Sequence, residues 1–256
     1  MENTPTLLTN RLILRQFVRE DLPALFSILS DPEVNTFLPW FTHQSMEETL
    51  SFLQTNFLET YSLPLGYRYA ICLKEDHIPI GYINISPNES HDLGYGIHRN
   101  FWHQGIATEA GKCLLDHIQK VKTTPFITAT HDKKNPNSGK VMKKLGMHYC
   151  YSYQEQWQPK NISVIFRMYQ MNLDGNVHKI YSQYWDQYPI HLSKQTYKKE
   201  VFCMVQNTSF FISQEISYLT CCSSLLPGIA WNKGRDSSRP FSKAPRAYLA
   251  PQSFRP

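Results

Sequence analysis

The stretch that decides the fold is LGYGIHRNFWHQGIATEAGKCLLDH, residues 93–117. Residues 93–98 predict a short strand, residues 99–105 a tight loop, and the remainder a helix that begins near Ile106. The helix is predicted because apolar residues recur at three- and four-residue steps, which places them on one face. These residues are Ile106, Ala107, Ala110, Cys113, Leu114, His117 and Ile118.

The start of this helix is a candidate phosphate-binding site. Backbone N–H groups near residues 104–108 lack helical partners, and together with the helix dipole they favour an anion. Gly105 allows an anion to approach the main chain closely. An ordinary strand-to-helix connection has the same pattern, so this physical argument leaves both interpretations open.

A resemblance to a known family favours the first interpretation. The run WHQGIATEA, residues 102–110, resembles the acetyl-CoA signature Q/R-x-x-G-x-G/A of the GNAT N-acetyltransferases, most closely in its RimJ/RimL-type branch. His103 stands where that branch has a small residue. The resemblance implies acetyl-CoA as co-substrate and assigns its contacts to Gly96, Ile97, His98, His103, Gln104, Gly105, Ile106, Ala107, Thr108 and Asn135.

A second motif lies further along the chain. HDKKNPNSGKVMKKLGM, residues 131–147, resembles the N-x-x-S…L-x-K-x-G-F run of the same family, with Asn135 and Ser138 in matching places. The order of predicted elements also fits, and the resemblance covers about residues 7–173. It implies an α/β fold of the mixed α+β kind, with a central, mostly antiparallel sheet flanked by helices.

The remaining elements are predicted from periodicity and from turn and cap residues. Strands are expected at residues 9–17, 67–73, 78–86, 126–130, 149–157 and 162–171. A first helix follows Glu20, and a second begins at a capping box formed by Ser45 and Glu48.

The charge and composition change towards the C-terminus. Residues 1–189 hold 17 Lys and Arg against 18 Asp and Glu, whereas residues 190–256 hold 9 against 3. We therefore expect an acetyltransferase domain at residues 1–175, a docked helix within residues 176–189, and a disordered basic tail at residues 190–256. The tail is either an extension without a folding role or a basic segment that touches RNA or a membrane.

Cysteine usage and hydropathy bear on the compartment. The six cysteines show neither C-x-x-C nor Cys/His metal-ligand spacing, and Cys72, Cys113 and Cys150 lie in apolar contexts typical of buried thiols. No stretch reaches the roughly 18 apolar residues of a membrane helix, and residues 1–6 do not resemble a signal peptide. These features favour a cytoplasmic protein with no metal and no membrane contact; nucleic-acid binding by the folded part is not expected.

The resemblance implies that an amine attacks the thioester directly. A backbone N–H near Ile97 or His98 would stabilise charge on the carbonyl oxygen, and Asn135 would orient the cofactor. Many family members carry a proton-donating tyrosine at the position of Met142, so Ser138 is the candidate donor to the leaving thiolate. The alternative for Ser138 is a hydroxyl that caps a helix.

The general base is left open by the sequence. Candidates are Glu109, His98, Glu89, His91 and a water relay, and a carboxylate at Glu109 is also favoured by the helix dipole alone. Deprotonating an alkyl amine at neutral pH costs roughly 4–5 kcal/mol, against about 1 kcal/mol for a peptide α-amine. A site without an evident strong base therefore favours an α-amine acceptor, as the branch resemblance also implies.

One stretch of the sequence is a candidate for the acceptor side. Pro39 and Trp40 are either part of a packed aromatic cap or line the substrate cleft. The expected partner is a protein or peptide N-terminus, with a small amine such as a polyamine or antibiotic as the alternative. A non-catalytic acetyl-CoA-binding module is a third hypothesis, and a homodimer is compatible with the sequence, which does not fix the oligomeric state.

Overall fold

A computed structural model describes residues 3–63, 66–176 and 178–192. Its N-terminal half contains β1 (Leu7–Leu8), β2 (Leu12–Arg15), α1 (Leu22–Leu29), α2 (Pro32–Asn35), α3 (Met46–Asn56), β3 (Tyr67–Leu73), β4 (Pro79–Ile85) and β5 (Leu93–Ile97). Then follow α4 (Ile106–Val121), β6 (Phe126–Asp132), α5 (Pro136–Lys144), β7 (His148–Trp157), β8 (Ile162–Asn172), α6 (Gln183–Gln187) and β9 (His191–Leu192). Short 3₁₀ turns precede α1, follow α3 and follow β5.

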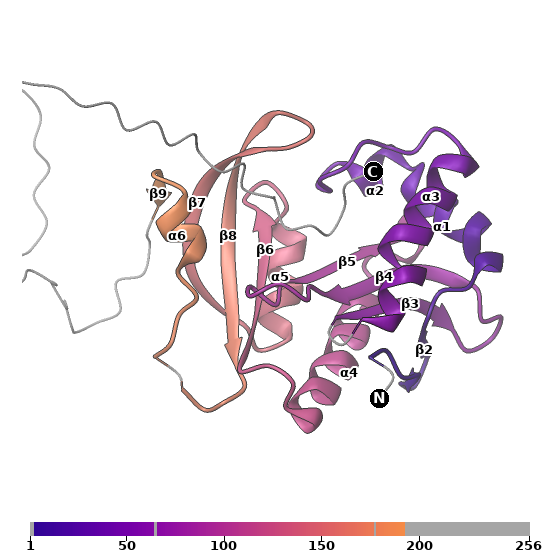
Figure 1. The fold of residues 1–256 in the computed structure, drawn as a ribbon, viewed down its shortest axis with the longest axis horizontal. Coiled ribbons are helices and arrows are strands. Elements are labelled where there is room, and N and C mark those ends of the chain that lie inside the picture. The colour runs from indigo at the N-terminus through magenta and orange to yellow at the C-terminus, as the bar shows by residue number, and fades with distance from the viewer. Residues whose placement is uncertain (1–2, 64–65, 177, 193–256) are drawn as a thin grey trace, which may run out of the picture. The chain divides into compact units, whose positions relative to one another are not determined.

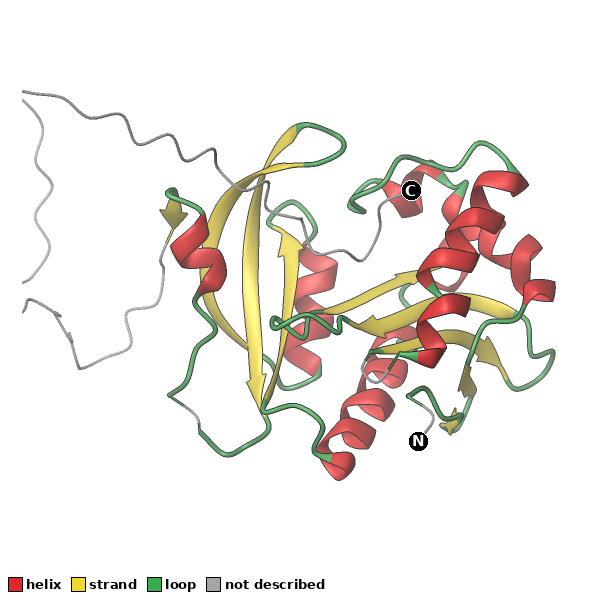
Figure 2. Cartoon of the chain, in the orientation of Figure 1, coloured by secondary structure: helices red, strands yellow, loops and turns green. Residues whose placement is uncertain are grey.

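The strands form two sheets that diverge from a common point (Figures 1 and 2). One sheet has the order β1-β2-β3-β4-β5 and the other β6-β8-β7-β9, with antiparallel pairing inside each. Between the edge strands β5 and β6 there is a single parallel bridge, Asp92 to Thr128. The predicted mixed fold with antiparallel pairing and flanking helices is confirmed. The expected single central sheet is instead divided into two between β5 and β6. As a result, the edge of β5 that faces β6 is unpaired beyond the bridge.

Helices cover both faces of the five-stranded sheet (Figure 1). One face packs against α4 through side chains such as Leu14, Tyr69 and Ile83. The opposite face packs against α1 and α3 through Ala70 and Tyr82. This separation follows from the alternation of side chains along each strand, since neighbouring residues in β3 point to opposite faces.

The helices begin close to where sequence signals place them. Ser45 caps α3, and its hydroxyl accepts a hydrogen bond from the N–H of Glu48 at 3.2 Å. Glu48 in turn accepts from the N–H of Gln44 at 2.8 Å. Helix α4 begins at Ile106 directly after Gly105, as predicted.

The segment after β8 packs against the second sheet. Tyr184 of α6 is buried, and its ring stacks on that of Tyr153 in β7 at 5.2 Å between centroids. His191 and Leu192 pair with Tyr153 and Ser152, so the backbone at these two residues is a strand and not the start of the predicted disordered tail. Residues 193–256, which contain the rest of that prediction, lie outside the described residues.

Within the described parts of the chain, no helix combines the length and hydropathy needed to cross a membrane. Of the three described cysteines, Cys72 is buried as expected, whereas Cys113 and Cys150 are only partly buried.

Candidate active site

The unpaired edge of β5 is the centre of the candidate site. His98 donates its N–H to the carbonyl of Ile80 at 2.8 Å, so this N–H is occupied by the sheet and is not the free donor that we expected. In an antiparallel ladder the bonding direction alternates along the strand. The N–H groups of Tyr95 and Ile97 therefore point to the edge that faces β6, where they are available to a ligand.

Trp102 ties the loop that follows β5 to the end of the strand. Its indole Nε1 donates to the carbonyl of Ile97 at 2.8 Å. This contact occupies the carbonyl at the free edge and leaves the Ile97 N–H as the available group. The same loop is closed by Gln104, whose side-chain amide donates to the carbonyl of Asn100 at 2.9 Å.

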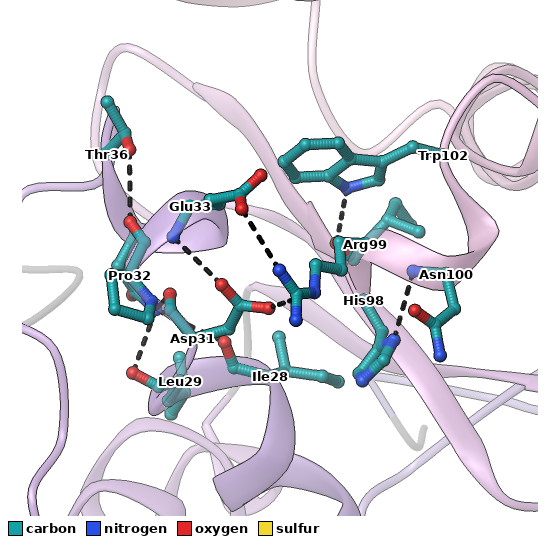
Figure 3. A network of polar contacts seen from close by, with 12 residues as sticks. Ile28, Leu29, Asp31, Pro32, Glu33, Thr36, His98, Arg99, Asn100 and Trp102 are labelled. Carbon is teal, nitrogen blue, oxygen red and sulfur yellow. Dashed lines mark hydrogen bonds and ion pairs between the residues drawn. The ribbon is translucent and has the colours of Figure 1, made fainter.

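Arg99 connects this loop to α2 (Figure 3). Its Nε lies 3.0 Å from the carboxylate of Asp31, and its Nη1 lies 3.0 Å from that of Glu33. Asp31 also caps α2 by accepting from the N–H of Glu33 at 2.9 Å. Next to Arg99, His98 accepts the N–H of Asn100 at its Nδ1, at 3.3 Å, which fixes the ring's orientation.

The N-terminus of α4 has the geometry of an anion site. Gly105 has a φ of 80° and His103 a φ of 61°, both in the left-handed region. The first helical N–H groups precede the first intrahelical bond, which Glu109 donates to the carbonyl of Gly105 at 3.0 Å. The N–H groups of Ile106, Ala107 and Thr108 are thus free of helical partners and, with the helix dipole, fit a phosphate.

Arg11 is a residue that sequence reasoning missed. Its guanidinium contacts the carboxylate of Glu109 at 2.6 Å and donates to the carbonyl of Gln104 at 3.1 Å. A β-carbon at Gly105 would lie 3.8 Å from the Arg11 guanidinium, so a positive charge stands beside the loop. The signal available in the sequence was an arginine that follows the β1–β2 turn, but nothing there indicated its partner 98 residues away.

Glu109 is held in place by two residues, Arg11 and Thr9. Besides the Arg11 side chain, it accepts from the hydroxyl of Thr9 at 2.6 Å and from the N–H of Arg11 at 3.1 Å. Burial acts to raise the pKa of Glu109, but these hydrogen bonds and the nearby charge outweigh it and leave the pKa below its usual value. A carboxylate so occupied is a weak base, so these contacts favour a positioning role over catalysis.

We expect Glu109→Gln to raise the KM for acetyl-CoA about three- to tenfold while kcat changes less than twofold, because the ion pair that supports the loop is lost. Steady-state kinetics and calorimetric binding of acetyl-CoA measure the two effects. Asp116→Asn, on the exposed side of the same helix, is the matched control. A hundredfold fall in kcat at unchanged KM would instead identify Glu109 as the base.

Ser138 and Tyr95 form a hydroxyl pair across the site. Their oxygens lie 2.9 Å apart, with Tyr95 on β5 and Ser138 in the first turn of α5. Burial raises the pKa of Tyr95 to about 12, partly offset by the hydrogen bond to Ser138, so the phenol keeps its proton. The alternation along β5 indicates the sheet face on which Tyr95 lies but not its partner on α5, so the sequence pattern alone does not identify Tyr95.

Asn135 caps α5. Its side-chain oxygen accepts from the N–H of Ser138 at 3.3 Å, and no described residue hydrogen-bonds to its amide nitrogen. Nearby, Gly139 packs so closely on His131 that a β-carbon there would lie 2.6 Å from the imidazole. Asn135 thus fixes the position of Ser138 through its side-chain oxygen.

Trp40 packs in the core beneath the site. It is 9% exposed, donates to the side chain of Asn35 at 2.9 Å, and contacts the rings of Phe52 and Tyr82. These contacts favour the packed aromatic cap. Pro39 is partly buried in the loop before it.

The structure therefore brings together most of the residues predicted for the cofactor. The end of β5, the loop at residues 98–105 and the start of α4 are continuous, and Ser138 joins them through Tyr95. Glu109 and Trp40 face other partners. Among the described residues, no group of three or more His, Cys, Asp or Glu side chains is arranged to hold a metal ion.

Comparison with known proteins gives a family match. Residues 11–148 match the acetyltransferase (GNAT) domain family. An uncharacterized N-acetyltransferase of Bacillus subtilis, YnaD, is 27% identical over 144 residues, which cover 54% of this chain and 80% of that protein.

Solved structures share the fold. An acetyltransferase of the GNAT family from Bacillus anthracis superposes with a TM-score of 0.59 at 22% identity, covering 66% of this chain and 99% of that one. RimL, a ribosomal L7/L12 alpha-N-protein acetyltransferase in complex with coenzyme A, gives a TM-score of 0.60 at 18% identity and the same coverage.

Proposed function

Because the chain belongs to the GNAT family and is an acetyl-CoA-dependent N-acetyltransferase, we propose that its acceptor is the N-terminal α-amine of a protein or peptide. The observation that carries this proposal is the state of Glu109. The carboxylate in the first turn of α4 is committed to Arg11 and Thr9, which leaves the site without a strong base at that position. An α-amine needs the least help, because its deprotonation at neutral pH costs only about 1 kcal/mol.

The chain's own residues would divide the remaining tasks. The free N–H groups at the start of α4 would hold phosphate, and the edge of β5 would hold the extended arm of the co-substrate. Acetyl-CoA supplies an activated acyl group as a thioester. The N–H of Ile97 would stabilise the negative charge that develops on the carbonyl oxygen, because a donor fixed beforehand in the sheet needs no reorganisation.

The Ser138–Tyr95 pair would stabilise the departing thiolate. Two hydroxyls that are already hydrogen-bonded to each other can relay a proton to the thiolate without moving far. Asn135 supports this role because it caps α5 and so fixes Ser138. His98 accepts a hydrogen bond at Nδ1, so in the neutral ring Nε2 carries the proton and could donate a hydrogen bond to the acceptor or to water. The proton that the amine loses would then pass to water.

Acetyl-CoA-dependent thiol release should occur with peptides that have a free N-terminus. The matched control is the same peptide set with blocked N-termini and an internal lysine, which tests the α-amine against an alkyl amine. Polyamines and aminoglycosides form a separate pool. Release only with that pool would contradict the proposed acceptor class and identify a small-amine acetyltransferase.

A further inference from the structure

Arg68 carries a buried charge that no part of the proposed mechanism uses. It lies in β3 and is only 4% exposed. Its Nε and Nη1 atoms are fully buried, and among the described residues no acceptor pairs with either. Arginine is rarely buried unless its charge is paired, because removal from water is costly.

Among the residues that the structure describes, no carboxylate forms an ion pair with Arg68. Burial lowers the pKa of its guanidinium, and the one group that opposes this effect is the phenol of Tyr61, not a carboxylate. By contrast, the partly exposed Arg15 on the neighbouring β2 forms a close ion pair with Asp21 at 2.7 Å. The two arginines therefore differ in that Arg68 has donors to offer to a ligand.

Strand register places Arg68 in a row that leads to the active edge of β5. Arg68 pairs with Asn84 of β4, and Asn84 pairs with Gly94 of β5. Alternation puts these three residues on the sheet face that packs against α1 and α3, as Ala70 and Tyr82 show. Directly opposite residues of this kind have side chains within contact distance of each other.

Asn84 forms the middle of the row. It is 5% exposed, and no described residue hydrogen-bonds to its side-chain amide. Its oxygen lies 3.3 Å from where a β-carbon of Gly94 would be, so the amide leans over β5. An unpartnered amide and an unpartnered guanidinium thus stand side by side, next to a strand position that has no side chain.

We infer that Arg68 and Asn84 form an anion-binding subsite for the acceptor, which takes a carboxylate at the second or third residue of the acetylated peptide. This inference rests on the proposed function. A guanidinium binds a carboxylate through two parallel hydrogen bonds, and the Asn84 amide can donate a third. The site therefore selects acidic N-terminal segments.

The spacing decides which residue carries the acid. Strands lie about 4.8 Å apart and residues about 3.3 Å apart along a strand, so Arg68 is roughly 10 Å across the sheet and roughly 10 Å along it from Ile97, whose N–H would face the thioester. An extended peptide spans about 3.3–3.6 Å per residue, so its α-amine at the β5 edge places the second and third side chains in reach of Arg68. A free amino acid is too short to span this distance.

The test compares two C-terminally amidated pentapeptides, one with glutamate and one with glutamine at positions two and three. Calorimetry on the coenzyme A-bound protein at fixed ionic strength measures their binding, and thiol release measures turnover separately. We expect the glutamate peptide to bind at least tenfold more tightly. Equal dissociation constants would overturn the inference, whereas a failure of turnover with both peptides would overturn the proposed function and leave the binding comparison valid.

Two variants connect the preference to the site. Arg68→Met keeps an unbranched apolar stem and removes the guanidinium with its charge, so the tenfold preference should vanish while the affinity for the glutamine peptide is kept. Asn84→Asp places a carboxylate beside Arg68, which should raise the melting temperature and abolish the preference. Asn84→Asp tests the proposed subsite even if Arg68→Met does not fold. If the Asn84→Asp variant still preferred the glutamate peptide, Arg68 and Asn84 would not form the subsite.

Two controls exclude a general charge effect. Lys74→Met removes an exposed cation from the turn between β3 and β4 and should keep the full preference. Inorganic phosphate, as a third titrant, tests for an oxyanion site unconnected with the acceptor. Binding of phosphate that depends on Arg68, with no preference between the two peptides, would overturn the assignment to the acceptor.

Discussion

Ser138→Ala is expected to lower kcat about a hundredfold while the KM for acetyl-CoA and the melting temperature stay near those of the unaltered protein. The hydroxyl of Ser138 lies 2.9 Å from that of Tyr95, and the two form the proposed route for a proton to the leaving thiolate. Positioned general acids typically contribute about 10²–10⁴-fold to a rate. Stability should hold, because the cap of α5 comes from Asn135 and accepts the backbone N–H of Ser138, not its hydroxyl.

Tyr95→Phe should give a smaller loss of kcat, about tenfold, because Ser138 keeps its own proton. The matched control is Tyr149→Phe, which removes a phenol that also lies 2.9 Å from a serine hydroxyl, that of Ser152 in β7. Steady-state kinetics with acetyl-CoA and with an acyl donor that has a more acidic thiol separates the roles. Losses that stay equally large with the more acidic leaving group would speak against proton donation by this pair.

Local patterns were sufficient to predict the strand, turn and helix to which the cofactor contacts are assigned. The strand, glycine turn and helix at residues 93–117 are continuous in sequence, so their geometry follows from local propensity and hydrogen bonding. The capping box that starts α3 is likewise confined to residues 44–48. Elements of this kind need no information on tertiary packing.

The misplaced assignments depend on contacts between distant segments. Glu109 was a candidate base until Arg11 and Thr9 were seen to occupy its carboxylate. The N–H of His98 was a candidate donor, but the pairing of β5 with β4 occupies it. Tyr95 and Arg68 were not singled out, because the significance of each depends on which strand or helix lies opposite, and periodicity does not encode that.

Gly96→Ala is expected to destabilise the protein by about 1–3 kcal/mol, because the new β-carbon has no room. It would lie 2.6 Å from the ring and hydroxyl of Tyr82, the cross-strand partner in β4. Tyr82 cannot move aside, since it is 2% exposed and its ring contacts those of Trp40 and Phe57. For a domain of this size the loss corresponds to a fall in melting temperature of roughly 5 °C.

The same substitution should lower kcat/KM at least tenfold, because relief of the clash displaces β5 and with it the N–H groups of Tyr95 and Ile97. Gly94→Ala is the matched control for stability: its β-carbon would lie 3.3 Å from the Asn84 amide, a side-chain end that can yield. A double-mutant cycle with Tyr82→Leu isolates the contact. If Gly96→Ala destabilised the Tyr82→Leu background as strongly as the unaltered protein, the close approach of Gly96 to Tyr82 would not be the cause, and β5 would need its glycine for another reason.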